Sequence, residues 1–127
     1  MKNRLAIIDD HVMMRAFLKE FFSRDYEVFT FPDVQEAWQW LEEGHFPDLI
    51  TVDLKMPGLS GMDFLTRIKG FPMFSHIPVI VVSGVDKSHD RIRCLELGAA
   101  DYITKPFNPQ ELALRVRRQL NLRKLWS

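Results

Sequence analysis

Five polar side chains that could do chemistry stand where short apolar stretches of the sequence end: Asp9, Asp10, Asp53, Ser83 and Lys105. Three carboxylates gathered in one place would repel one another and need a cation, and a ligand set made of oxygen suits Mg²⁺. A hard metal ion, a lysine ammonium and a hydroxyl around one carboxylate form a site for a phosphoryl group in transfer. Asp53 is then the candidate nucleophile. A helix cap, a turn or a surface position also explains each residue singly, but their joint occurrence favours a site.

The stretches before these residues have the composition of strands in a parallel sheet. They are short, apolar and rich in β-branched or aromatic residues, which is typical of strands buried on both faces. The predicted strands cover residues 4–8, 26–31, 49–53, 79–82 and 102–104. Pro57 and Gly58 predict a tight turn after the third strand.

Between the strands, the sequence has helical periodicity or helix-capping residues. The first helix has an apolar stripe at helical spacing, formed by Met14, Phe17, Leu18, Phe21 and Phe22. Asp33, Ser60 and Asn108 are predicted N-caps of later helices. This alternation predicts an α/β fold of the flavodoxin-like kind, a doubly wound five-stranded parallel sheet in the order 2-1-3-4-5 with five helices. In that order the five polar side chains converge on one crevice.

Composition excludes several classes of protein. The chain has 127 residues, enough for one domain with a full core, and 17 basic residues balance 17 acidic ones. Without net charge, we expect no direct nucleic-acid binding and no attraction to a membrane. The single Cys94 excludes an internal disulfide and fits a reducing compartment. No apolar run has the length of a membrane span or a signal peptide, so a cytoplasmic location is predicted.

The four histidines are scattered without metal-ligand spacing, and solvent-facing or capping roles are expected for them. His11 directly follows the acidic pair and is therefore a candidate for the edge of the site.

The motifs of this chain resemble the receiver domain of bacterial two-component response regulators. The resemblance covers nearly the whole chain in order, and it is carried by Asp9-Asp10, Asp53 with Met56-Pro57-Gly58, Ser83-Gly84 and residues 98–107. It implies that residues 1–127 are a receiver domain, alone or at the front of a longer regulator. The implied function is a phosphorylation-activated signalling switch in a two-component phosphorelay.

The resemblance also implies roles for the acidic residues. Asp53 is the phosphoacceptor that forms an aspartyl phosphate, supplied by a sensor histidine kinase or a phosphotransfer protein. Asp10, Asp53 and the backbone carbonyl of Lys55 ligate Mg²⁺, and Asp9 acts on the metal through water.

The remaining implied roles concern the response to phosphorylation. Ser83 and Tyr102 match the switch pair of the family, with Tyr102 turning inward after phosphorylation, and Lys105 matches the lysine that contacts the phosphate. The Lys105-Pro106 bond is expected to be cis. Phosphorylation is expected to alter the surface of the fourth helix, fifth strand and fifth helix. That surface would engage a downstream effector domain or protein, or form a phosphorylation-dependent homodimer.

Three alternative functions are less favoured by the residues. A Mg²⁺-dependent phosphohydrolase of the haloacid-dehalogenase kind needs a second Asp two residues after its nucleophile, where this chain has Lys55. A flavin-binding domain needs a donor-rich loop where Asp9 and Asp10 would repel a phosphate. A degenerate receiver used for docking would not need the complete acidic set. We therefore expect no enzyme beyond a phosphoacceptor that assists its own phosphorylation and dephosphorylation.

The lifetime of the aspartyl phosphate depends on whether water can approach in line with the Asp53–phosphorus bond. In the family, two variable positions flank this approach, and here they are Lys55 and Val85. Because Val85 cannot orient water and the stem of Lys55 fills space, a comparatively long-lived phosphoryl group is predicted.

Overall fold

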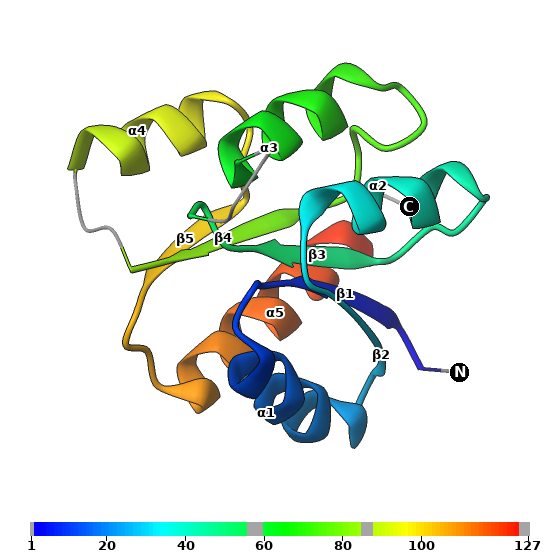
Figure 1. Ribbon diagram of the computed structural model, residues 1–127, viewed down its shortest axis with the longest axis vertical. Coiled ribbons are helices and arrows are strands. Elements are labelled where there is room, and N and C mark those ends of the chain that lie inside the picture. Colours follow the sequence, from blue (N-terminus) through cyan, green and yellow to red (C-terminus); the bar gives the residue numbers. More distant parts are fainter. Residues whose placement is uncertain (1, 56–59, 85–87, 125–127) are drawn as a thin grey trace.

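The chain alternates between strands and helices throughout the part described by the computed structural model, residues 2–55, 60–84 and 88–124 (Figure 1). The strands are β1 (Arg4–Ile8), β2 (Glu27–Phe31), β3 (Leu49–Val52), β4 (Val79–Ser83) and β5 (Asp101–Thr104). The helices are α1 (Val12–Ser23), α2 (Val34–Glu42), α3 (Gly61–Gly70), α4 (Ser88–Glu96) and α5 (Pro109–Lys124).

The five strands form one parallel sheet in the order β2-β1-β3-β4-β5, which confirms the predicted fold. At the carboxyl edge, Ile8 of β1 is in register with Phe31 of β2 and Val52 of β3, and Ser83 of β4 is in register with Thr104 of β5. The residues that follow these strand ends therefore emerge side by side.

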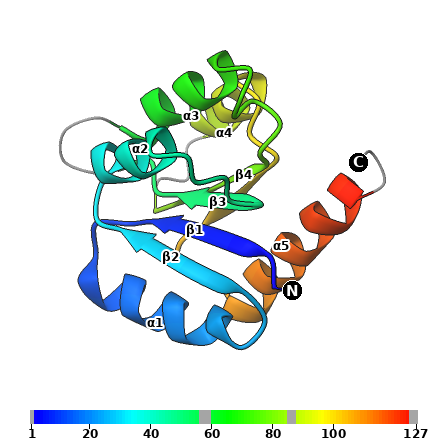
Figure 2. The ribbon, with the colours of Figure 1, turned by 90° about the vertical axis from the view of Figure 1, so that its right-hand side faces the viewer.

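Helices cover both faces of the sheet, with α1 and α5 on one side and α2, α3 and α4 on the other (Figures 1 and 2). Beneath α1 and α5 the core is mostly aliphatic around Phe22, whereas beneath α2 and α3 it also contains an aromatic group, with Trp38 in edge contact with Phe64 and Phe74. None of the helices in the described residues is both long enough and apolar enough to cross a membrane.

The structure departs from the sequence predictions in details. The helix predicted from the first apolar stripe is present as α1, with Leu18 and Phe22 buried, Met14 and Phe21 packed against the core, and Phe17 47% exposed. The five-residue stripe is wider than the strip of α1 that the sheet covers. Strand β3 ends at Val52, one residue earlier than predicted. The Lys105-Pro106 bond is cis, as predicted. The predicted turn at 57–58 and position 85 lie outside the described residues.

Candidate functional site

Two carboxylates are buried at the carboxyl edge of neighbouring strands. Asp9 directly follows β1, and Asp53 directly follows β3. The main-chain N–H of Asp9 donates to Phe31 O at 3.1 Å and that of Asp53 donates to Ile8 O at 3.1 Å. These bonds continue the sheet pattern beyond the strand ends and fix both backbones. The side chains of Asp9 and Asp53 are each about 5% exposed, so this edge of the sheet holds two nearly buried acids.

Helix α3 fixes Asp53 from the other side. Gly61, its first residue, donates its N–H to Leu54 O at 3.2 Å. A Cβ atom at Gly61 would overlap the carbonyl oxygen of Asp53. Glycine is therefore required here for close approach of the helix to the site, with Ser60 and Asp63 forming a capping box that begins the helix.

Lys105 bridges the two buried acids. Its Nζ donates to Asp9 Oδ2 at 2.8 Å and to Asp53 Oδ2 at 2.9 Å. Burial alone would lower the pKa of Lys105, but its hydrogen bonds and charge attraction to the two carboxylates outweigh burial and raise that pKa above the ordinary value. The ammonium therefore stays charged. The main-chain N–H of Lys105 donates to Ser83 O at 2.7 Å, which fixes the backbone from which this side chain extends.

The third acid, Asp10, completes a cluster suited to a metal ion. One ligand atom from each of Asp9, Asp10, His11 and Asp53 lies within 4.8 Å of the others. Asp10 Oδ1 is buried and makes no hydrogen bond with the described residues. A buried carboxylate oxygen without a partner is costly, and a hard cation such as Mg²⁺ accepts oxygen ligands of this kind. The residues present therefore fit a magnesium ion.

Lys55 lies beside the cluster through its backbone. Its main-chain N–H donates to Asp53 Oδ1 at 3.0 Å, and its side chain is exposed. Metal binding by its carbonyl remains a prediction.

Two further residues contact the site: His11, at the N-cap of α1, and Arg15, within α1. The sequence indicated His11 only as a candidate for the edge of the site. His11 donates its main-chain N–H to Asp9 Oδ1 at 2.9 Å, and its Nδ1 lies 3.2 Å from Asp9 Oδ1 and 3.2 Å from Asp10 Oδ1. Arg15 was missed altogether; its Nη1 donates to Asp9 O at 2.8 Å. The available signal was spacing, because a residue one turn into a helix can reach back to the loop that precedes it.

The predicted switch pair is buried behind the acids. Ser83 is fully buried and Tyr102 is 7% exposed, with a hydrogen bond between their side chains. Burial raises the pKa of the Tyr102 hydroxyl, while the bond to Ser83 and the charge of Arg91 lower it in part. The Arg91 guanidinium lies 5.5 Å from the ring centroid. An inward turn of Tyr102 was expected to follow phosphorylation, and the ring is already inward in this structure.

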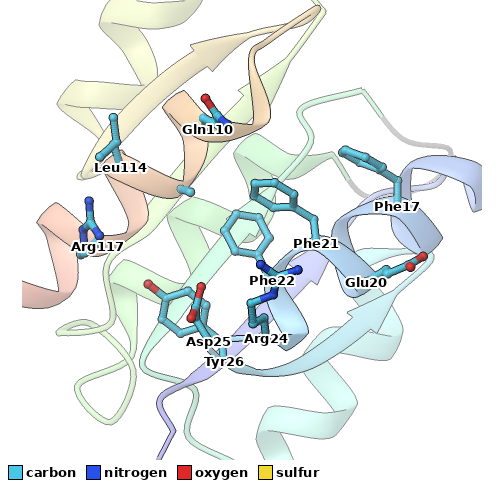
Figure 3. A pocket seen from close by; sticks show the side chains of 11 residues that line it. Phe17, Glu20, Phe21, Phe22, Arg24, Asp25, Tyr26, Gln110, Leu114 and Arg117 are labelled. Carbon is cyan, nitrogen blue, oxygen red and sulfur yellow. The ribbon is translucent and has the colours of Figure 1, made fainter.

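A separate groove of about 960 Å³ lies between α1 and α5, away from the acidic cluster (Figure 3). Phe17 and Phe21 line it from α1, and Leu114 and Arg117 line it from α5. None of the predicted site residues lines this groove. The acids instead stand at the carboxyl edge of the sheet.

Comparisons with known proteins agree with this geometry. The response regulator receiver domain family matches residues 5–117. The chain is 34% identical over 122 residues to the cyclic di-GMP phosphodiesterase response regulator RpfG of Xanthomonas campestris pv. campestris (strain 8004), covering 94% of this chain and 32% of that protein. It is 35% identical over 118 residues to the phosphate regulon transcriptional regulatory protein PhoB of Escherichia coli (strain K12), covering 92% and 51%. The chain thus spans about half or less of these relatives. A CheY-like receiver domain protein from Methanospirillum hungatei JF-1 has the same fold, with a TM-score of 0.93 at 24% identity and full coverage of both chains.

Proposed function

The chain belongs to the response regulator receiver domain family, whose members are phosphoacceptor switches of two-component signalling, and from that premise we propose that Asp53 accepts the phosphoryl group. One observation carries the proposal: Lys105 bridges Asp53 and Asp9 at 2.9 and 2.8 Å, beside an Asp10 oxygen that has no hydrogen-bond partner among the described residues. The fixed cation suits the negative charge that arrives with a phosphoryl group, and the unsatisfied acid suits a metal ion that would neutralise that charge.

In the proposed step, one oxygen of the Asp53 carboxylate attacks phosphorus. An oxygen–phosphorus bond forms as the phosphorus–nitrogen bond to the donor histidine breaks, and the donor nitrogen keeps the electron pair of that bond. Lys105 is already within hydrogen-bond reach of Asp53, so its ammonium can follow the new negative charge without a large movement. The buried backbone of Asp53 holds the nucleophile in position.

Asp10, Asp53 and the carbonyl of Lys55 would hold Mg²⁺, with Asp9 acting through water. When bound, the ion neutralises charge on the phosphoryl oxygens. Lys105 and the His11 main chain already donate hydrogen bonds to the two oxygens of Asp9, so Asp9 would act on the metal indirectly.

The donor protein has to reach the carboxyl edge, and apolar side chains are exposed there. Val12 is 66% exposed and Met13 is 80% exposed, and both follow His11, the residue after the acidic pair. We assign these residues to docking of a histidine kinase or phosphotransfer protein, because exposed apolar groups beside a site mark a contact surface. We further propose a cytoplasmic receiver domain spanning residues 1–127, without direct nucleic-acid binding.

The chain acts as a switch and not as a phosphohydrolase in this proposal. Lys55 occupies the position where a hydrolase would carry its acid–base aspartate, and its side chain is exposed. Val85, the other position predicted to slow loss of phosphate, lies outside the described residues.

The output surface is proposed to be α4, β5 and α5, acting on an effector domain or protein or through a phosphorylation-dependent homodimer. Ser83 connects the site to Tyr102 on β5, so a phosphoryl group that draws on the Ser83 hydroxyl changes the partner of Tyr102. Chemical-shift changes on adding beryllofluoride should cluster at Ser83, Tyr102 and α4. Changes confined to α1 and α2 would contradict this route.

Phosphorylation with acetyl phosphate tests the site directly. Intact mass should show one added phosphoryl group, lost in Asp53→Asn and lost when a chelator removes divalent ions. Asp48→Asn is the matched control, because Asp48 is also an acid at a β3 terminus but lies at the opposite edge of the sheet. Equal labelling of Asp53→Asn and wild type would contradict the assignment.

A further inference from the structure

The imidazole of His11 occupies a position in the acidic cluster that neither the fold nor the helix requires. His11 is the N-cap residue of α1, yet its side chain makes no capping hydrogen bond. Its main-chain N–H is anchored to Asp9 Oδ1 at 2.9 Å, which fixes the start of the side chain beside the acids. The ring itself is 68% exposed, so its polar contacts with the two acids, and not packing, hold it there.

The distance from His11 Nδ1 to Asp10 Oδ1 matches that between neighbouring ligands of one ion. Nδ1 lies 3.2 Å from Asp10 Oδ1, and it is also within hydrogen-bond distance, 3.2 Å, of Asp9 Oδ1. In an octahedral shell with bonds of about 2.1 Å, adjacent ligand atoms are about 3.0 Å apart. Asp10 Oδ1 is also the buried oxygen that lacks a hydrogen-bond partner among the described residues. The nitrogen is therefore placed next to the oxygen that most needs a cation.

Oxygen and nitrogen ligands favour different metals. Mg²⁺ takes carboxylate, carbonyl and water oxygens, whereas imidazole suits Ni²⁺, Zn²⁺ and neighbouring transition metals. We propose that His11 is a metal-selectivity residue, which ligates a borderline divalent transition metal at the acidic site while leaving binding of Mg²⁺ to the carboxylates. The proposal rests on the metal site of the proposed function and adds a nitrogen ligand to it.

Metal titration of the untagged chain tests this inference with Ni²⁺ and Mg²⁺ as the probes. Calorimetry should show that His11→Ala lowers Ni²⁺ affinity about tenfold or more, with Mg²⁺ affinity changed less than about twofold. His89→Ala is the matched control, because His89 is also exposed and also lies beside an acid, with Nε2 3.5 Å from Asp90 Oδ1. It should leave both affinities unchanged.

Proton NMR of the Ni²⁺-loaded chain gives a second readout that is independent of phosphorylation. A ligating imidazole should give hyperfine-shifted ring resonances that persist in His89→Ala and disappear in His11→Ala. Equal Ni²⁺ binding by wild type and His11→Ala, or an equal loss of Ni²⁺ and Mg²⁺ affinity, would overturn the role of His11 alone. A wild-type chain that binds neither ion would overturn the proposed metal site together with this inference.

Discussion

Charged residues of similar types lie at both edges of the sheet. At the amino edge they have hydrogen-bond partners, whereas at the carboxyl edge one of them lacks a hydrogen bond among the described residues. At the amino edge, Asp48 accepts the Arg4 N–H at 2.7 Å, and Arg123 Nη1 donates to its Oδ1 at 2.9 Å. There too, the Lys69 Nζ donates to the carbonyls of Ser75 and Ile77 at 3.0 and 2.9 Å. Each of these charged groups makes at least two hydrogen bonds, which connect loops to the sheet.

At the carboxyl edge the same residue types are left unbalanced. Two of the three carboxylates, Asp9 and Asp53, share Lys105, and one oxygen of Asp10 has no hydrogen-bond partner within the described part of the chain. The difference shows how a function can be located by its electrostatics. Charges that serve the fold are paired, whereas charges that await a ligand are crowded at some cost to stability.

The largest difference between the edges should appear when their lysines are removed. Lys105→Met leaves Asp9 and Asp53 buried without their shared cation and should lower the free energy of unfolding by about 3 kcal/mol in metal-free buffer at neutral pH. Lys69→Met loses bonds to neutral carbonyls and should cost about 1 kcal/mol. Urea denaturation measures both. Mg²⁺ should restore part of the loss in Lys105→Met and none in Lys69→Met, and equal losses would remove the distinction between the edges.

The acids of the two edges should respond in opposite directions. Asp48→Asn loses a charge-assisted bond to Arg123 and should destabilise the chain by about 1–2 kcal/mol. Asp10→Asn relieves repulsion and should stabilise the metal-free chain by about 1 kcal/mol. Thermal melting distinguishes the two signs.

The same two variants should differ in their response to metal. Mg²⁺ at ten times its dissociation constant should stabilise wild type and Asp48→Asn by about 1.4 kcal/mol, and Asp10→Asn by less. A melting temperature of wild type that does not depend on Mg²⁺ would show that the crowded acids do not bind it.

The smallest predicted effect on the free energy of unfolding concerns the switch pair, Ser83 and Tyr102, and it is measured at alkaline pH. Because burial raises the folded-state pKa of Tyr102 above the ordinary value for tyrosine, the stability that this group contributes is complete below that ordinary value and is lost as pH rises through the folded pKa. The charge of Arg91 lowers the pKa of Tyr102, so Arg91→Ala should raise it further and cost about 0.5–1 kcal/mol of cation–π attraction. Phenolate absorbance in a Tyr26→Phe background measures the titration. Arg93→Ala on the same helix is the control, and a Tyr102 pKa that falls in Arg91→Ala would contradict the inward position of the ring.

Much of the fold was predictable because the strand and helix patterns of the individual segments agree with one doubly wound parallel sheet. The strand order follows from alternating apolar stretches and helical segments, and the register of Ile8 with Val52 then places Asp9 beside Asp53. The sequence also indicated Lys105 as a site residue. Its two simultaneous partners could not be predicted, because they depend on side-chain rotamers at three strand ends.

Other details depend on tertiary packing that periodicity does not describe. Helical spacing predicts a stripe on α1 but not how much of it the sheet covers, so the exposure of Phe17 could not be predicted. The loop geometry after β1 decides two further details: that Asp10 Oδ1 lacks a hydrogen bond among the described residues, and that His11 Nδ1 lies close to it. The burial of Tyr102 depends on contacts with Ser83 and Arg91 from two other elements.

The bridge between Lys105 and Asp9 joins residues 96 positions apart in the sequence. A chain emerging from the ribosome has Asp9, Asp10 and Asp53 long before it has the lysine, and β5 has to join the sheet before the ammonium can reach the acids. Contacts of such long range form late and slowly. Phosphate uptake should therefore be slow in a nascent chain that lacks Lys105, so that efficient uptake requires β5 to have joined the sheet.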